Sequence, residues 1–271
     1  MTHIDAPIGR FGGIPLNRPL VMGIVNVTPD SFSEQGETFA EGDAIARGLE
    51  QAEQGADIID VGGESTRPGA SPVASEEESR RVLPVVHALS QAGAVVSIDT
   101  RHAAVMEAAV QAGARIINDV SALTGDANSL AVAAASGADV VLMHMPGGPT
   151  TMLAHMDDYD NVVEGVLAYL RQRIATCEAA GIPRSRLAVD PGFGFGKRIS
   201  DNYRLLEGLA RFRGFGCPVL VGLSRKFGKG KAPKERLAES LALARQAVAN
   251  GAAIVRTHDV KETVAALGLR G

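Results

Sequence analysis

The stretch Leu20-Val-Met-Gly-Ile-Val-Asn26 is an apolar, β-branched run that stops on a polar residue, and it has seven counterparts along the chain. The counterparts are Ile58–Val61, Val95–Ile98, Ile116–Ile117, Val140–Met143, Leu187–Val189, Val219–Leu223 and Ile254–Val255, and polar residues follow nearly all of them. Short apolar runs of this kind are typical of parallel strands buried on both faces. The chain is therefore expected to contain eight such strands.

Segments with helical spacing lie between these runs, and several of them end at a Gly-Ala pair that precedes the next strand. One predicted helix follows Pro233 and stops before Gly251. Another follows Ser75-Glu-Glu-Glu78, which is expected to form a capping box. The repeated order of strand, helix, glycine and strand predicts an α/β fold, a single (β/α)8 TIM barrel. The 271 residues leave a lead-in of residues 1–19 and one barrel over residues 20–271, because such a barrel takes about 250 residues.

An open, doubly wound sheet is the alternative architecture, since Gly192-Phe-Gly-Phe-Gly196 follows a predicted strand. The spacing of this segment is GxGxG rather than the GxGxxG of dinucleotide-binding folds, and residues 197–200 separate it from the next predicted helix. A tight, glycine-lined turn beside a flat ligand is the better interpretation.

Composition excludes several classes of protein. The net charge of −4 argues against a protein that binds nucleic acid through the phosphate backbone. Cys177 and Cys217 lack the spacing of a metal site and are interpreted as buried thiols. Neither a signal peptide nor a run long enough to cross a membrane is recognisable, so we predict a cytoplasmic protein without membrane association.

Three polar residues at predicted strand ends, Asp99, Asn118 and Asp190, are candidate ligand-binding groups. Each could instead cap the helix that follows it. In a barrel, however, all strand ends share one rim, so the three side chains would converge. Two carboxylates and an amide suit a planar heterocycle with adjacent N–H donors, and Lys226 could donate to the acceptors of its ring.

A second set of candidates is suited to a diphosphate. Arg256 and His258 follow the last predicted strand, where barrels commonly bind phosphate. Asn26 could supply a hard oxygen ligand to Mg²⁺ that is held mostly by phosphate oxygens and water. A zinc site is not supported.

Long segments of the chain closely resemble the dihydropteroate synthase family. The matching segments are Met22–Ser33, Ile59–Ala70, Ser97–Thr100, Ile116–Asp119, Leu142–Met145, Leu187–Lys197, Gly222–Lys226 and Ile254–Val260. The resemblance implies a (β/α)8 barrel that joins 6-hydroxymethyl-7,8-dihydropterin diphosphate to 4-aminobenzoate and releases pyrophosphate.

The resemblance also implies a role for each site residue. Asp99, Asn118, Asp190 and Lys226 would hold the pterin, Arg256 and His258 would grip the diphosphate, and Asn26 would meet its Mg²⁺ cofactor. Thr66, Arg67 and Pro68 would help to form the aminobenzoate site, and the expected substrate-binding set also contains Met143, Phe195, Gly222 and Phe227. A homodimer is expected from the family as well.

One segment departs from the family pattern. The family usually continues Ser-Arg-Lys-Ser, whereas this chain reads Ser224-Arg-Lys-Phe-Gly228, and the stretch that follows is short. We therefore expect Phe227 to reshape the pocket for the second substrate. Two other functions are alternatives: a pterin-binding module that exchanges a methyl group with a corrinoid partner, and a catalytically inert pterin-binding paralogue.

Overall fold

The computed structural model describes residues 9–27, 37–66, 71–156, 159–227 and 232–269. Eight parallel strands form one sheet in the order β8-β7-β6-β5-β4-β3-β10-β9. These strands are β3 (Leu20–Asn26), β4 (Ile58–Gly62), β5 (Val96–Asp99), β6 (Ile116–Asp119), β7 (Asp139–Met143), β8 (Leu187–Asp190), β9 (Leu220–Gly222) and β10 (Ile254–Thr257). A parallel bridge between Val189 and Val219 joins the two outermost strands, so that the sheet closes on itself.

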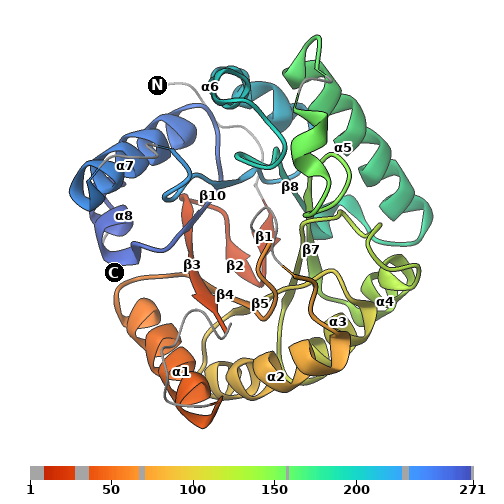
Figure 1. Ribbon diagram of the computed structural model, residues 1–271, viewed down its shortest axis with the longest axis vertical. Helices are drawn as coiled ribbons and strands as arrows, with labels where there is room; N and C mark the ends of the chain where they lie inside the picture. Colours follow the sequence, from red (N-terminus) through yellow and green to blue (C-terminus); the bar gives the residue numbers. More distant parts are fainter. Residues whose placement is uncertain (1–8, 28–36, 67–70, 157–158, 228–231, 270–271) are drawn as a thin grey trace.

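A helix follows every strand of this sheet, and the helices surround it as an outer ring (Figure 1). They are α1 (Glu37–Glu53), α2 (Ser75–Gln91), α3 (Ala103–Gln111), α4 (Ser129–Ser136), α5 (Val162–Ala179), α6 (Ile199–Glu207), α7 (Pro233–Ala249) and α8 (Val260–Ala266). The predicted (β/α)8 barrel is confirmed, and the open sheet is excluded. The helix expected after Pro233 is also confirmed, and Gly251 follows its end with a φ of 101°.

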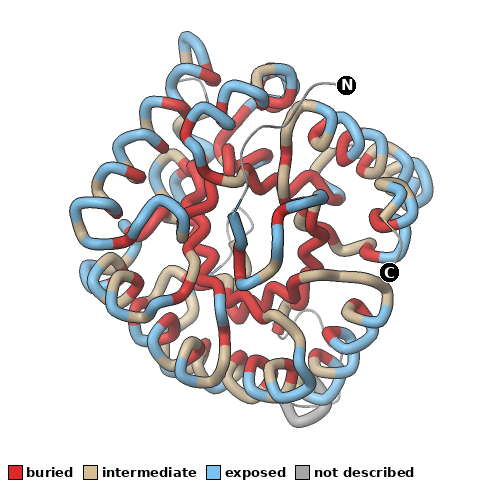
Figure 2. Tube along the Cα trace, turned by 180° about the vertical axis from the view of Figure 1, so that it is seen from behind, coloured by how far each residue is buried: buried red, intermediate tan, exposed pale blue. Residues whose placement is uncertain are grey.

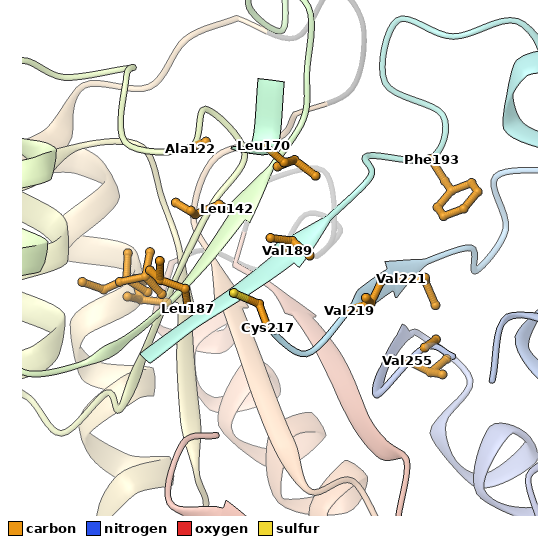
Figure 3. Packing of buried hydrophobic residues seen from close by; sticks show 14 of the residues in the cluster. Ala122, Leu142, Leu170, Leu187, Val189, Phe193, Cys217, Val219, Val221 and Val255 are labelled. Atoms are coloured by element: carbon orange, nitrogen blue, oxygen red, sulfur yellow. The ribbon is translucent and has the colours of Figure 1, made fainter. Parts of the chain in front are cut away.

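Alternate residues of the strands belong to two separate apolar cores, except in β5, which contributes Val96 and Ile98 to the outer core and no residue to the inner one. One core lies between the strands and the helices, and Figure 3 shows Leu142, Val189, Val221 and Val255 from four neighbouring strands within it. The other core lies inside the barrel. It consists of Phe11, Leu16, Leu20, Met22, Ile58, Ile116, Val141, Ala188, Leu220 and Ile254. The side-chain period of two therefore identifies which residues of each strand face the barrel axis.

A short antiparallel hairpin, β1 (Arg10–Phe11) with β2 (Ile14–Pro15), covers the amino-terminal end of the barrel. Figure 2 shows it lying across the ring of buried strands. Phe11 is completely buried in the interior core, and the Gly12 amide donates to Asp139 at the start of β7 (2.6 Å). Because the hairpin occupies this end, the opposite rim is the one left for chemistry. The prediction that residues 20–271 form one domain stays a prediction.

The expected capping box at the start of α2 is wrong. The helix is capped at Ala74 without a side-chain hydrogen bond. The Glu78 carboxylate is fully buried, accepts from the Thr100 hydroxyl (3.0 Å), and lies 2.7 Å from Nδ1 of His102. Tertiary partners therefore override the local capping pattern, and Glu78 fastens α2 to the segment after β5.

Cys177 and Cys217 are buried and unpaired, as expected. None of the helices that the structure describes is long and apolar enough to cross a membrane.

Candidate active site

The polar residues at the carboxyl ends of the strands are on the strand face that points to the barrel axis, because residues two apart in a strand lie on the same face. Asn118 follows Ile116 in this way, and Asp190 follows Ala188. Strand pairing places the neighbouring rim positions in register: Gly62 pairs with Asp99, Asp99 with Asn118, Met143 with Asp190, and Gly222 with Arg256. The rim residues that were expected to converge therefore belong to one end of one barrel.

Arg256 lies at the centre of a buried network of charges. Its Nε donates to Oδ2 of Asp60 and its Nη2 donates to Oδ2 of Asp99, both at 2.6 Å. The Asn118 side-chain amide donates to the same Asp60 oxygen at 3.0 Å. Four side chains from β4, β5, β6 and β10 are thus linked through a single guanidinium and a single carboxylate. Arg256 therefore lies among the acidic side chains of the site and does not form a separate group of cationic residues with His258.

This environment shifts the pKa values of both partners. Burial raises the pKa of Asp99 to about 7, although the nearby Arg256 guanidinium acts in the opposite direction. Asp60 and Asp99 raise the pKa of Arg256 further, against the effect of burial, so the guanidinium stays charged. A permanently charged arginine beside a carboxylate that titrates near neutrality is suited to binding a ligand that carries both N–H donors and anionic groups.

Asp190 and Lys226 form a second charged part of the site. Asp190 Oδ1 accepts from the Gly192 amide (2.7 Å), and burial raises its pKa while the Lys226 charge opposes that rise. Lys226 Nζ donates to the Phe193 carbonyl (2.6 Å) and lies 4.3 Å from the ring centroid of Phe195. Burial lowers the pKa of Lys226 to about 8. A flat ring can therefore meet a carboxylate, an ammonium group and an aromatic side chain in one place.

The loop after β8 is held by a lysine that the sequence did not single out. Lys197 is buried, and its ammonium donates to the carbonyls of His144 (3.2 Å), Gly192 (2.8 Å) and Phe195 (3.0 Å). Gly192 has a φ of 72°, and a Cβ there would collide with the His144 carbonyl. The hydrogen bonds of Lys197 and the close approach of Gly192 hold this loop near the end of β7. The loop in turn places Phe195 beside Lys226.

The ends of β9 and β10 are joined side by side. The Ser224 hydroxyl accepts from the His258 amide (3.3 Å) and lies 3.2 Å from Nδ1 of the same histidine. Arg225, with a φ of 60°, forms an ion pair with Asp259 through an Nη2–Oδ1 contact of 2.5 Å. Burial, aided by the charges of Arg225 and Arg256, lowers the pKa of His258 to about 3. His258 is therefore a neutral hydrogen-bonding group and not a second cation.

Apolar side chains complete the interior of the rim. Met143 packs with Val120, Met145 and Met152 in a small buried cluster, and Phe195 packs against it. Gly222 lies beside Lys226, since an added Cβ would come 3.6 Å from Nζ. These contacts bring Met143, Phe195 and Gly222 to the rim.

The remaining candidate residues lie at the edge of the site. Asn26 ends β3 in register with Gly62, and it is half-buried. Thr66 is half-buried in the segment after β4, whereas Arg67 and Pro68 lie outside the described residues. Phe227 packs on Tyr203 of α6, with ring centroids 5.7 Å apart.

Glu64, two residues before Thr66, forms a half-buried salt bridge with Arg101. Glu64 accepts from Arg101 at 2.8 and 2.9 Å and from the Val73 amide at 3.0 Å. Glu64 thus ties both ends of the segment that carries Thr66 to the loop after β5. Among the described residues, the hydrogen bonds of the charged network around Arg256 do not include Thr66 or Phe227.

Magnesium has one candidate protein ligand here. Among the described residues, no group of three or more histidine, cysteine or acidic side chains could hold a metal ion. An amide oxygen such as that of Asn26 fits an ion that keeps several waters and is held mainly by substrate phosphates. The donor set of the described residues therefore fits a magnesium ion that arrives with a diphosphate.

Comparison with known proteins identifies the family of the chain. The model of the pterin-binding enzymes matches residues 22–258. The dihydropteroate synthase of Escherichia coli K12 is 49% identical over 259 residues, which cover 94% of this chain and 91% of that protein.

Solved structures give the same result. A Xanthomonas albilineans dihydropteroate synthase with 4-aminobenzoic acid superposes with a TM-score of 0.88 at 48% identity, covering 94% of this chain and 93% of that one. The same comparison with the Xanthomonas albilineans enzyme in complex with 7,8-dihydropteroate gives a TM-score of 0.82 at 44% identity, with 94% and 93% coverage. The chain therefore belongs to the pterin-binding enzymes and, among them, to the dihydropteroate synthases, which are transferases of folate biosynthesis.

Proposed function

We propose that this barrel condenses 6-hydroxymethyl-7,8-dihydropterin diphosphate with 4-aminobenzoate at the rim that carries Arg256. The observation that carries the proposal is the linkage of Arg256, Asp99 and Asn118 at the same end of the barrel as Asp190 and Lys226. Membership of the dihydropteroate synthases supplies the reaction, and the charges supply a reason for each part of it.

The pterin binds through its ring edges. Asp99, Asn118 and Asp190 provide oxygen acceptors for the N–H groups of a 2-amino-4-oxo-pyrimidine ring, and Lys226 donates to its oxygen or nitrogen. Met143, Phe195 and Gly222 contribute apolar surface to the flat faces of the ring. Burial makes each of these polar contacts more selective, because a ligand that lacks the matching group leaves a buried partner unsatisfied.

The diphosphate leaves as the C–O bond at the exocyclic methylene breaks and its electron pair goes to the departing oxygen. Arg256 contributes a charged donor and His258 a neutral one to the leaving group, which lowers the cost of the departing charge. Asn26 would meet Mg²⁺, which when bound supplies further neutralisation of the diphosphate. The positive charge that remains is delocalised into the pterin ring, and the carboxylates around it stabilise that charge.

The arylamine nitrogen then forms the C–N bond with its lone pair and loses a proton to solvent or to the released pyrophosphate. An arylamine is neutral and nucleophilic near pH 7, so no strong general base is required. Thr66, Arg67, Pro68 and Phe227 are proposed to border the aminobenzoate. Support for Thr66 comes from the Glu64–Arg101 salt bridge, which fixes the segment next to the rim.

The cellular setting is proposed from the family and from composition. We infer a cytoplasmic homodimer without nucleic-acid or membrane partners, built from one barrel domain over residues 20–271. Sedimentation of the purified chain at micromolar concentration tests the dimer, and a single monomeric species would contradict it.

The test of function is direct. Purified protein is incubated with both substrates and Mg²⁺, and dihydropteroate and pyrophosphate are measured together. Equal amounts of both products are expected, and the Asp190→Ala variant should form neither. Binding of the pterin without any dihydropteroate, in a protein that also fails to complement a folate auxotroph, would support the inert paralogue instead.

A further inference from the structure

Asp60 is an acidic residue that lies in the middle of a strand inside the barrel and has no place in the roles assigned above. It is completely buried in β4, two residues after Ile58 of the interior core and two residues before the end of the strand. Its Oδ2 atom accepts from Arg256 at 2.6 Å and from Asn118 at 3.0 Å. Both partners are residues that the proposed function places against the substrate.

Asp60 contacts side chains from strands that are not its neighbours in the sheet. In the sheet order β6-β5-β4-β3-β10, Asn118 lies two strands to one side of β4 and Arg256 two strands to the other. No backbone hydrogen bond connects strands that are two apart, so the register alone does not fix the distance between their side chains. Asp60 spans this gap through the barrel interior with a single carboxylate oxygen.

Asp99 also pairs with Arg256, but its situation differs. The Asp99 side chain is 14% exposed, whereas that of Asp60 is 0% exposed. Asp99 is the carboxylate within reach of a ligand that enters from the rim, so a pterin N–H can compete with Arg256 for its oxygen atoms. Asp60 lies deeper and is able to keep its bond to Nε of Arg256 when Asp99 changes partner.

We propose that Asp60 is the positioning residue of this site, which holds the Arg256 guanidinium and the Asn118 amide in place for the pterin diphosphate. The inference rests on the proposed function and adds to it a residue that acts through two others. Because Asn118 donates its NH₂ group to Asp60, its carbonyl oxygen is the amide atom left to accept from the ligand. Because Asp60 anchors Nε of Arg256 and Asp99 takes one N–H of Nη2, the N–H groups of Nη1 and the second N–H of Nη2 remain for anionic oxygens.

The same strand offers a matched control. Asp57 precedes β4 at the opposite end of the barrel, where it accepts from Arg18 at 2.6 and 2.9 Å and from the Val21 amide at 2.9 Å. Asp57→Asn therefore weakens another arginine–carboxylate pair, a more exposed one, without touching the rim. Asp60→Asn makes the same chemical change among the site residues.

The first measurement is the dissociation constant of the pterin diphosphate without 4-aminobenzoate, beside that of the pterin alcohol that lacks the diphosphate. Asp60→Asn should weaken the diphosphate ligand by at least about tenfold and the alcohol by less, because the alcohol loses only the Asn118 orientation. Asp57→Asn should lower the melting temperature and change both constants by less than about twofold. Unchanged affinity for the diphosphate in Asp60→Asn would overturn the proposal.

A double-variant cycle keeps the test decisive if Asp60→Asn alone does not fold. Arg256→Met and Asp60→Asn/Arg256→Met both remove the arginine, and the double variant leaves no uncompensated charge between the two positions. With the arginine absent, Asp60→Asn should cost no further affinity for the diphosphate group; a further loss of about tenfold in the double variant relative to Arg256→Met would contradict the positioning role. Turnover by the unaltered enzyme is measured separately, so a failure of the proposed function is distinguishable from a failure of this inference.

Discussion

Two layers of side chains fill the barrel interior: a lower layer toward the amino-terminal ends of the strands and an upper layer toward their carboxyl ends. Both come from the same strands and the same face, yet they differ completely in chemistry. Below, Ile58, Ile116 and Ala188 pack with Phe11 of the hairpin in a dry apolar core. One side-chain repeat higher on those same strands, the residues are Asp60, Asn118 and Asp190. A step of two residues therefore separates a layer that stabilises the fold from one that is arranged for binding.

The difference shows how a buried polar layer is tolerated. Burial of an unpaired charge costs several kcal/mol, by order of magnitude, unless a partner compensates it. In the upper layer Arg256 neutralises Asp60 and Asp99, while Asp190 takes a backbone amide and lies near Lys226. The apolar layer beneath needs no such compensation and supplies the free energy of folding that the upper layer lacks.

The largest effect is expected when a polar side chain of the upper layer is placed two residues earlier in the same strand, in the lower layer. Ile116→Asn places in the lower layer the amide that is native at position 118, but without Asp60 as its acceptor. Loss of the apolar side chain and burial of an unsatisfied amide should destabilise the fold by about 4 kcal/mol or more. Urea unfolding measures the change. Ile116→Val, the control, should cost about 1 kcal/mol, and similar losses in both variants would show that the layers are less distinct than the packing indicates.

The reverse experiment alters the upper layer and should leave the fold intact. In Asp190→Asn the side-chain oxygen can still accept from the Gly192 amide, so the loop after β8 keeps its anchor. The carboxylate charge that faces Lys226 is lost, and a charged hydrogen bond to the pterin with it. We expect pterin affinity to fall by about one hundredfold, since such bonds contribute about 1.5–3 kcal/mol. Calorimetric titration measures the affinity; normal binding in a folded variant would remove Asp190 from the site.

The sequence predicted the barrel and most of its rim, because both follow from simple periodicities. Apolar runs of strand length indicated the strands, and polar residues at their ends indicated which side chains would share a rim. Asp99, Asn118, Asp190, Lys226 and Arg256 were identified in this way, and the structure brings them to one end of the barrel. The resemblance to the dihydropteroate synthases supplied the reaction, which periodicity does not contain.

Residues that act through tertiary contacts were not predicted. Asp60 interrupts an apolar strand on its interior face, and that interruption was the only available signal; its partners are 58 and 196 positions away in sequence. Lys197 lies in the stretch that separates the glycine-rich turn from the next predicted helix, and no local pattern indicates the three carbonyl partners that make it a buried anchor. Glu78 was assigned to a helix cap because local pattern gives no information about Thr100 and His102.

The upper layer should also respond to pH in a way that the lower layer cannot. Burial raises the pKa of Asp99 to about 7 and lowers that of Lys226 to about 8. Asp99 accepts from the pterin N–H groups most strongly when ionised, and Lys226 donates best when protonated. Pterin affinity should therefore be greatest between these values and fall by up to about tenfold per pH unit on either side. Titrations from pH 5 to 9 measure this, with the ionisation of the free pterin determined separately.

The sign of the stability change separates this effect from acid unfolding. Because the pKa of Asp99 is higher in the folded chain than its ordinary value, its protonation favours the folded state as the pH falls from about 7 toward 4. The Asp99 contribution thus predicts weaker binding without a parallel loss of stability near pH 6. Asp99→Asn should remove the acid limb and Lys226→Met the alkaline limb. An acid limb that persists in Asp99→Asn would assign it to another group.

The smallest expected effect concerns Phe227, which lies at the edge of the upper layer. Its ring packs against Tyr203 of α6, while the preceding residue, Lys226, points to Phe193 and Phe195 within the site. Phe227→Ser restores the hydroxyl that is usual in the family and removes an aromatic ring, so the Michaelis constant for 4-aminobenzoate should fall by a few-fold, on the order of one hydrogen bond to a carboxylate. Sulfonamide inhibition should strengthen in parallel, because sulfonamides imitate the same substrate.

Phe227→Leu removes the ring without adding a hydroxyl and therefore separates the two causes. A lower Michaelis constant in both variants would point to steric narrowing by Phe227, and an unchanged constant in both would refute the proposed role of Phe227. The pterin dissociation constant should stay unchanged in both, since the contacts of the deep network around Arg256 do not include this side chain.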